Sequence, residues 1–200
     1  MDFMDINKLI ANRVLALREA RQLSLTALAE RSGVSRSNIS LIERGESSAT
    51  ATVLDKLAGA LGVTLASLFE AGDDAPAPPS PYSPAASQPV WTDPASGYQR
   101  RQLSPATRSP MQLVEVIFPP GQRVSYDQVH REAEIYQQVW LLEGTMDISA
   151  GEGSWRLSPG DCLAIREDQQ ISYANPGKEA ARYLVGLVTL PFAARPGAAG

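Results

Sequence analysis

Residues 25–44 read LTALAERSGVSRSNISLIER and set the architecture of the first third of the chain. Apolar residues recur three and four positions apart on both sides of Gly33, which is the spacing of two amphipathic helices. Gly33 suits a tight connection because glycine adopts positive φ without a steric penalty. Ala29 is small enough to lie where two helices cross. The stretch therefore predicts a helix, a short turn and a second helix.

The second of these helices has two different faces. At about 100° per residue, Arg36, Ser37 and Ser40 fall on one side of it. Ile39 and Ile42 fall on the other side, where they can fill a core. We therefore expect one face to pack against the protein and the opposite face to offer hydrogen-bonding groups to solvent.

The helical spacing continues through the N-terminal region. Ser24, Ser35 and Thr50 each precede an apolar-periodic stretch, where a side-chain oxygen can accept from the free N–H groups of a helix N-terminus. The pattern predicts an all-α domain of five short helices at residues 6–21, 25–32, 36–44, 51–61 and 65–69.

A proline-rich stretch, AGDDAPAPPSPYSPAASQPV, follows the helical region. Its six prolines and few apolar residues predict a semi-rigid, extended linker. The expected organisation is a helical domain at 1–70, a linker at 71–90, a second domain at 91–192 and a flexible tail at 193–200.

The second domain has the composition of strands. Runs rich in β-branched and aromatic residues alternate with Pro- and Gly-containing turns. The clearest runs are residues 111–118, 135–142, 162–166 and 182–190. Many short strands at near-regular spacing predict an all-β sandwich or barrel.

Charge and composition narrow the possible functions. The net charge is −4, yet residues 7–58 carry eight Lys and Arg against five Asp and Glu, which suits a DNA-binding module joined to a domain with another role. The acidic N-terminus and the lack of a long apolar run predict no signal peptide and no membrane segment, hence a soluble cytoplasmic protein. One cysteine, Cys162, and one histidine, His130, exclude dithiol chemistry and multi-histidine metal sites within one chain.

The segment 25–44, together with Leu17-Arg18-Glu19, Ile42 to Gly45 and Leu57 to Gly62, resembles the Cro/C1-type helix-turn-helix, or xenobiotic-response-element family, from residue 7 to about 69. The resemblance implies that the second helix lies in the major groove of double-stranded operator DNA. It also implies an ion pair between Arg18 and Glu43. The residues it assigns to DNA are Arg36, Ser37 and Ser40 for base edges, Leu41 beside thymine methyl groups, and Ser24, Arg44, Ser47 and Ser48 for phosphates. A plain helical bundle, or the same fold used for protein contact, are the alternatives.

The region from Gln99 to about Leu190 resembles the cupin domain that follows this DNA-binding module in bacterial regulators, a jelly-roll barrel of about six to eight strands. The motifs that carry the resemblance are Pro119-Pro120-Gly121, Leu141 to Gly144, Leu157 to Asp161 and Asn175-Pro176. Metal-binding cupins place their ligands at positions that correspond here to His130, Glu132, Gln137 and Ile171. An amide is a poor ligand and an isoleucine is none, so we expect no metal and no other cofactor.

The barrel mouth is instead predicted to hold a small-molecule effector. The candidate ligand-binding residues combine apolar walls with a few polar groups: His130, Glu132, Gln137, Val139, Met146, Arg166, Ile171 and Tyr173. No Ser, His and Asp order typical of a triad and no Gly-rich phosphate loop is present, which argues against an enzyme.

The sequence thus predicts a two-domain transcriptional regulator that binds operator DNA as a homodimer, with the cupin domain sensing a small molecule and supplying most of the dimer contact. A second copy is expected because one module of this size buries too little surface for tight binding. The alternatives are a metal-dependent cupin enzyme fused to a DNA-binding domain, and a constitutive DNA-binding dimer with a purely structural barrel.

Overall fold

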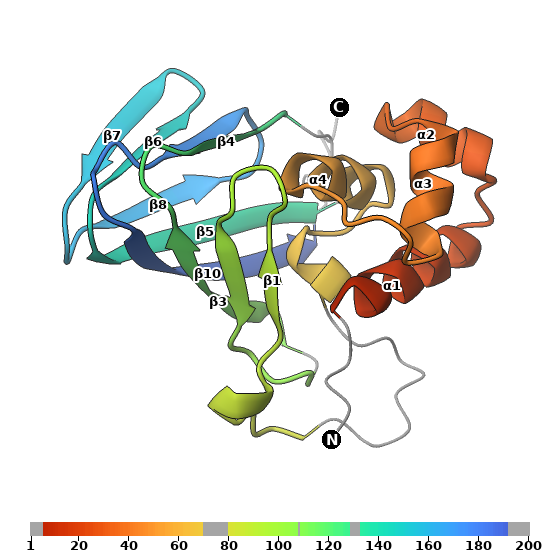
Figure 1. Ribbon diagram of the computed structural model, residues 1–200, viewed down its shortest axis with the longest axis horizontal. Coiled ribbons are helices and arrows are strands. Elements are labelled where there is room, and N and C mark those ends of the chain that lie inside the picture. The colour runs from red at the N-terminus through yellow and green to blue at the C-terminus, as the bar shows by residue number, and fades with distance from the viewer. Residues whose placement is uncertain (1–5, 70–79, 108, 129–132, 192–200) are drawn as a thin grey trace, which may run out of the picture.

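The structure, a computed structural model, describes residues 6–69, 80–107, 109–128 and 133–191 (Figure 1). For Ala133 and Pro191 the structure describes the backbone and not the side chain. The N-terminal part is helical, with α1 at Ile6–Ala20, α2 at Leu25–Ser32, α3 at Arg36–Glu43, α4 at Ala51–Ala60 and a 3₁₀ helix, η1, at Ala66–Phe69.

Polar side chains begin three of these helices where the sequence predicts them. The hydroxyl of Ser24 accepts a hydrogen bond from the N–H of Ala27 at 3.1 Å, and Ser35 does the same one helix later. Thr50 caps α4 in the same manner. Gly33 ends α2 at a φ of 68°, and its N–H donates to the carbonyl of Ala29. Local chemistry therefore fixes the turn that joins α2 to α3.

The predicted fifth α-helix is wrong in type. Residues 65–69 form the short helix η1, in which the N–H of Ser67 donates to the carbonyl of Thr64 and that of Leu68 to Leu65. The hydroxyl of Thr64 also accepts from the N–H of Ser67 at 3.0 Å. Five residues cannot sustain several i to i−4 bonds, so the tighter i to i−3 pattern prevails. Over residues 6–69 the domain thus has four α-helices and η1.

The second part contains ten strands among its described residues, more than the six to eight expected. They are β1 (Val90–Thr92), β2 (Gln99–Gln102), β3 (Met111–Phe118), β4 (Arg123–Tyr126), β5 (Ala133–Glu143), β6 (Met146–Ala150), β7 (Gly153–Leu157), β8 (Cys162–Arg166), β9 (Ile171–Ala174) and β10 (Ala181–Pro191), with a further 3₁₀ helix, η2, at Ala85–Ser87. The short strands β1 and β2 escape prediction because their sequences, VWT and QRRQ, offer little periodicity.

The strands form two antiparallel sheets that face each other (Figure 1). The buried residues between them are mostly apolar. One sheet has the order β1-β2-β3-β10-β5-β8 and the other the order β4-β9-β6-β7. Alternate residues point inward, so Val116 on β3, Tyr183 on β10 and Leu141 on β5 form one buried row across the larger sheet. This is the two-sheet arrangement of a cupin barrel.

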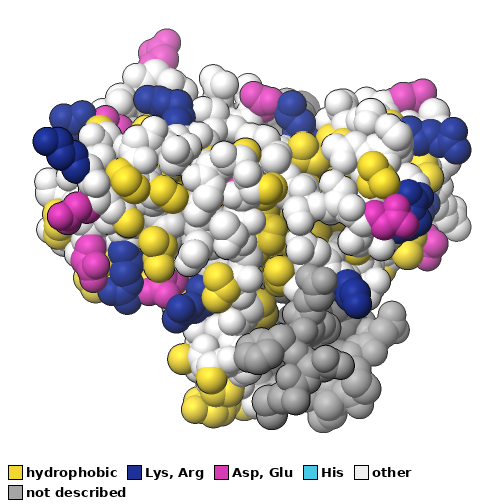
Figure 2. Space-filling model, viewed as in Figure 1, with side chains coloured by type: hydrophobic (Ala, Val, Ile, Leu, Met, Phe, Trp, Pro, Cys, Tyr) yellow, Lys and Arg dark blue, Asp and Glu magenta, His cyan; other side chains and the backbone are white. Residues whose placement is uncertain are grey.

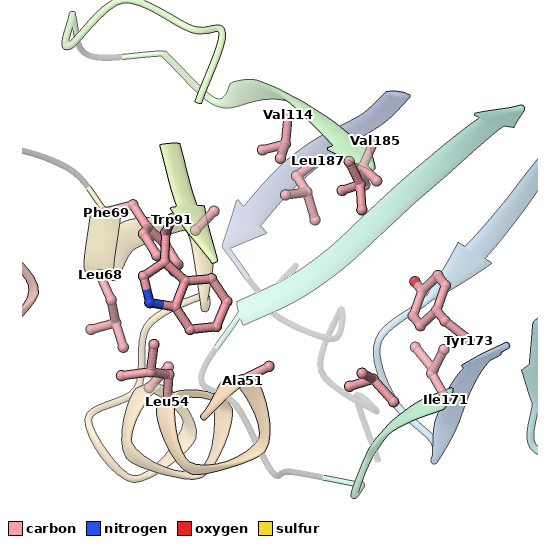
Figure 3. Packing of buried hydrophobic residues seen from close by; sticks show 14 of the residues in the cluster. Ala51, Leu54, Leu68, Phe69, Trp91, Val114, Ile171, Tyr173, Val185 and Leu187 are labelled. Carbon is pink, nitrogen blue, oxygen red and sulfur yellow. The ribbon is translucent and has the colours of Figure 1, made fainter. Parts of the chain in front are cut away.

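The helical domain packs directly on the barrel. Figure 1 shows α4 nearest to the strands and α2 and α3 farther away. In Figure 3, Trp91 of β1 lies between Phe69 and Leu54, and the Phe69 and Trp91 ring centroids are 5.5 Å apart. On the polar side, Asp93 accepts a hydrogen bond from the N–H of Ala51, the first residue of α4, at 2.9 Å. Apolar packing and a helix cap therefore join the two domains.

The proline-rich segment is described only from residue 80 onward. Its residues 71–79, together with Glu70 before it and the tail at 192–200, lie outside the described residues. The predicted linker role and the domain boundaries stay predictions. Among the described residues, no helix is long and apolar enough to cross a membrane.

Candidate nucleic-acid interface and barrel cavity

Helix α3 presents the polar face that the sequence predicts. Arg36 and Ser37 are exposed and Ser40 is partly exposed, while Ile39 and Ile42 are buried. Leu41, on the edge of this face, keeps 38% of its surface accessible, although a leucine of a folded domain is more often covered. The helix therefore has a free surface of the size and polarity that could read base edges.

An ion pair holds α3 against α1. The Nε and Nη2 of Arg18 donate to the two carboxylate oxygens of Glu43 at 2.6 and 2.9 Å, and Nη1 donates to the carbonyl of Leu23. This two-point hydrogen bond raises the pKa of Arg18 above its usual value. The pair implied by the family resemblance is present, and its two charge-assisted hydrogen bonds join the C-terminal ends of α1 and α3.

The residues predicted to contact phosphates differ in how they are engaged. The Nη1 of Arg44 donates to the hydroxyl of Ser40 at 2.5 Å, and its Nη2 donates to Glu46 at 2.8 Å. This hydrogen bond lowers the pKa of Glu46. The Arg44 contacts are exposed, and exposed pairs of this kind are worth little, so a phosphate can displace the carboxylate.

The three serines among the phosphate candidates are also near the surface. Ser24 is exposed and already caps α2, Ser48 is exposed and Ser47 is partly exposed. Figure 2 shows basic and acidic side chains mixed over the helical end of the molecule. The role of the three serines in binding DNA stays a prediction.

The barrel contains a cavity that is partly open to solvent and also touches the helical domain. About 70 Å³ is open to the centres of water-sized molecules, and one water needs about 10–15 Å³ on this measure. Asp55 of α4 and Thr64 to Ala66, at the start of η1, line one side of the cavity, and strands and loops of the barrel line the rest. The space suits a small molecule, and such a molecule would contact both domains.

Four tyrosines line this cavity. The hydroxyls of Tyr98 and Tyr126 lie 3.0 Å apart, and the hydroxyl of Tyr173 donates to Oε1 of Gln137 at 2.9 Å. Burial raises the pKa of Tyr98 to about 12 and raises the pKa of Tyr126, Tyr173 and Tyr183 as well. The phenols are therefore neutral at pH 7 and can donate hydrogen bonds.

Arg100 is a cavity residue that the sequence analysis missed. It lies on β2, only 9% of its surface is exposed, and it lines the cavity. Its Nε and Nη2 are buried and have no hydrogen-bond partner within the described part of the chain. The only sequence signal is the pair Arg100-Arg101 in a strand whose side chains alternate, so one of the two must point inward.

The structure describes six of the eight predicted ligand-binding residues and places them in three different settings. Gln137, Ile171 and Tyr173 line the cavity. Val139 and Met146 are fully buried in the barrel interior. Arg166 is partly exposed and forms ion pairs with Glu134 and Asp168. His130 and Glu132 lie outside the described residues.

The described positions of the cupin metal site do not fit a metal ion. Oε1 of Gln137 already accepts a hydrogen bond from Tyr173, and Ile171 supplies only hydrocarbon. Transition metals in cupin-type sites require imidazole or carboxylate donors at such positions. Within the described residues, no group of three or more His, Cys, Asp and Glu side chains could hold a metal ion.

The fold and these two regions together define a helix-turn-helix protein with a C-terminal cupin domain. Residues 14–68 match the family model described as helix-turn-helix, and residues 114–187 match the one described as cupin domain. The chain belongs to the family of HTH-type transcriptional regulators. It is 36% identical over 73 residues to the uncharacterized HTH-type transcriptional regulator y4dJ of Sinorhizobium fredii (strain NBRC 101917 / NGR234), a match that covers 36% of this chain and 95% of that protein.

Two further similarities extend over nearly the whole chain. The HTH-type transcriptional regulator SutR of Escherichia coli (strain K12) is 25% identical over 185 residues, which cover 90% of this chain and 94% of SutR. The crystal structure of an HTH_3 family transcriptional regulator from Vibrio cholerae is 25% identical and superposes with a TM-score of 0.72 over 94% of this chain and 98% of the other. The order of the two domains is therefore shared with regulators of similar length.

Proposed function

We propose that the protein is a sequence-specific DNA-binding regulator whose affinity for its operator depends on a small molecule in the barrel cavity. The observation that carries this proposal is that the cavity is lined by both domains. A ligand that contacts Thr64 to Ala66 and the barrel at once binds one relative placement of the domains better than another. It therefore shifts the population of DNA-binding conformations.

The DNA-binding half of the proposal rests on α3. Arg36 can form two hydrogen bonds to a guanine, and Ser37 and Ser40 can accept or donate to either purine. Arg44, Ser47 and Ser48 lie where they could hold phosphates, and Ser24 stands at the start of α2. The protein acts on double-stranded DNA in the cytoplasm, without catalysis and without a metal ion.

The protein acts as a homodimer through the outer face of the larger sheet. Trp140 on β5, Leu113 and Ile117 on β3 and Tyr136 are large hydrophobic side chains that remain exposed there. Trp140 is 48% exposed and stands opposite Leu184 of the central strand β10. These apolar side chains share the face with the ion pairs of Arg182 to Glu115 and Glu143. Exposed apolar groups beside charged ones are typical of a surface that a second copy covers.

Filling the cavity tests the coupling without knowledge of the natural ligand. Val185→Phe places a phenyl group in the cavity, and Thr189→Phe adds the same group at an exposed position of the same strand. Duplexes are selected from a random pool with the full chain, and affinity is measured by fluorescence anisotropy. We expect Val185→Phe to change the dissociation constant by about five-fold or more, and Thr189→Phe to leave it unchanged. Equal affinities of folded Val185→Phe and wild type would refute the coupling.

A second experiment tests the dimer. Trp140→Asp places a charge in the apolar face, and Trp155→Asp makes the same change at a 41% exposed tryptophan of the smaller sheet. We expect sedimentation at micromolar concentration to show a monomer for Trp140→Asp and a dimer for Trp155→Asp. A dimer in both cases would move the interface elsewhere.

A further inference from the structure

The guanidinium of Arg100 is a buried cation with unused hydrogen-bond donors. Its Nε and Nη2 have no acceptor among the described residues, although they are shielded from water. A buried, unpaired donor of a charged group destabilises a protein by more than a neutral one does. Such a group persists in a folded protein when a partner from outside satisfies it.

The neighbours of Arg100 leave its hydrogen-bonding edge free. The Cζ atom lies 5.3 Å from the centre of the Phe69 ring, so the aromatic face stabilises the charge. A ring face accepts no strong hydrogen bond from Nε or Nη2, whose N–H groups lie in the plane of the guanidinium. A planar carboxylate matches two such donors in parallel.

The acidic residues that line the cavity do not fill this place. Asp127 is paired with Lys56 at 3.4 Å and its side chain is 61% exposed. Asp55 and Glu167 have interactions of their own. None of the three accepts a hydrogen bond from Nε or Nη2 of Arg100.

The chemistry of the other cavity walls indicates what the rest of the ligand is like. Val116, Val185, Leu187 and Ile171 supply apolar walls. Burial raises the pKa of Tyr98, Tyr173 and Tyr183, and the positive charge of Arg100 opposes this rise. The carboxylates of Asp55 and Glu167 add to the rise at Tyr98 and Tyr173 respectively. A neutral phenol near a cation can donate to the same anion without repelling it, although the hydroxyl of Tyr173 must first turn away from Gln137.

We propose that Arg100 binds the carboxylate of the effector, and that the effector is a small organic acid with an apolar body. This inference rests on the proposed function and deepens it. Because Phe69 belongs to η1 and lies against Arg100, a carboxylate at Arg100 acts at the contact between the barrel and the helical domain.

The test compares acids with their uncharged and cationic analogues. Isovalerate and phenylacetate are added to the full chain at matched ionic strength, next to isovaleramide, phenylacetamide and isopentylamine. We expect the acids to raise the melting temperature by about 5–10 °C at a hundred-fold excess over the dissociation constant, and the amides and the amine to have no effect. Stabilisation by the amine or the amides, or by none of the compounds, would overturn the proposal.

Two arginines of the same strand provide the matched variants. Arg100→Gln removes the buried cation, and Arg101→Gln removes a 41% exposed one. We expect Arg100→Gln to weaken acid binding by about thirty-fold or more in calorimetry, and Arg101→Gln to keep it. The ligand-free Arg100→Gln protein should melt at or above the wild-type temperature. A large drop in that temperature, with acid binding retained, would show a structural role instead.

DNA affinity separates this proposal from the one on which it rests. If the acids bind through Arg100 but leave the anisotropy curve on selected DNA unchanged, the sensing function fails and the carboxylate site stands. If Val185→Phe alters DNA affinity but no acid binds, the carboxylate site fails and the coupling stands.

Discussion

Helix α3 of the helical domain and strand β2 of the barrel each carry an arginine at the centre of a proposed site, in opposite environments. Arg36 is exposed beside a buried Ile39, whereas Arg100 is 9% exposed and faces the barrel interior. A solvated arginine is available to DNA without any effect on folding. A buried one is tied to the stability of the domain that encloses it. The comparison teaches that function and stability should separate in the helical domain and be coupled in the barrel.

The largest expected effect is on the stability of the helical domain, at a buried ion pair outside the proposed DNA-binding face. Glu43→Ala leaves Arg18, whose side chain is 14% exposed, without its carboxylate partner. We expect the free energy of unfolding to fall by about 3 kcal/mol, measured by urea denaturation. The double variant Arg18→Met with Glu43→Leu should recover most of the loss. A fall in the free energy of unfolding of less than about 1 kcal/mol would show that the Arg18–Glu43 pair behaves like a solvent-exposed salt bridge.

The next effect tests the separation directly. Arg36→Ala should lower affinity for selected DNA by about 1–3 kcal/mol, change binding to scrambled DNA much less, and leave the melting temperature unchanged. Arg44→Ala serves as the comparison, since it should weaken all sequences alike and reduce the salt dependence. Anisotropy curves at two salt concentrations measure both. Equal losses on both duplexes for Arg36→Ala would remove it from base reading.

A smaller effect is expected inside the barrel, where stability and site are coupled. Gln137→Leu removes the acceptor of the buried Tyr173 hydroxyl, and we expect the free energy of unfolding to fall by about 1 kcal/mol. Tyr173→Phe in the same background should restore stability, because both polar partners are then gone. Thermal unfolding of the single and double variants decides this, and additive losses would contradict the pairing.

The smallest effect concerns the barrel surface. The hydrogen bonds from Arg156 hold the pKa of Asp147 below its usual value. A lowered carboxyl pKa stabilises the fold above the ordinary range near pH 4, and this contribution disappears as the pH falls through the lowered value. Asp147→Asn should therefore differ from wild type slightly at pH 7 and not at pH 2. Melting curves at the two pH values check this, and a larger difference at low pH would reverse the sign.

The helical domain could be predicted further than the barrel. Period 3.6 places Arg36, Ser37 and Ser40 on one face, and the three predicted caps are present, because these features depend on residues close in sequence. The type of η1 was missed since length, rather than composition, decides between α and 3₁₀ there.

The interior of the barrel depends on pairing between distant strands. The sequence places Gln137, Ile171 and Tyr173 in the barrel, but Arg100 and Arg101 are adjacent and chemically identical, so only the register of β2 with β3 shows which one is buried. The contact of Phe69 with Trp91 spans the proline-rich segment and leaves no local signal.

The carboxylate of Asp93 has a consequence for the engineering of chimeric regulators. It belongs to the barrel, is 2% exposed, and accepts from the first N–H of α4 as well as from the N–H of Ser96. A DNA-binding head excised near residue 70 and grafted onto a foreign sensor loses this acceptor and the favourable charge at the start of α4. We expect such a graft to work best when the new sensor domain supplies an aspartate at the position of Asp93, next to the start of α4. Whether a DNA-binding domain and a sensor domain are compatible therefore depends partly on a residue of the sensor domain.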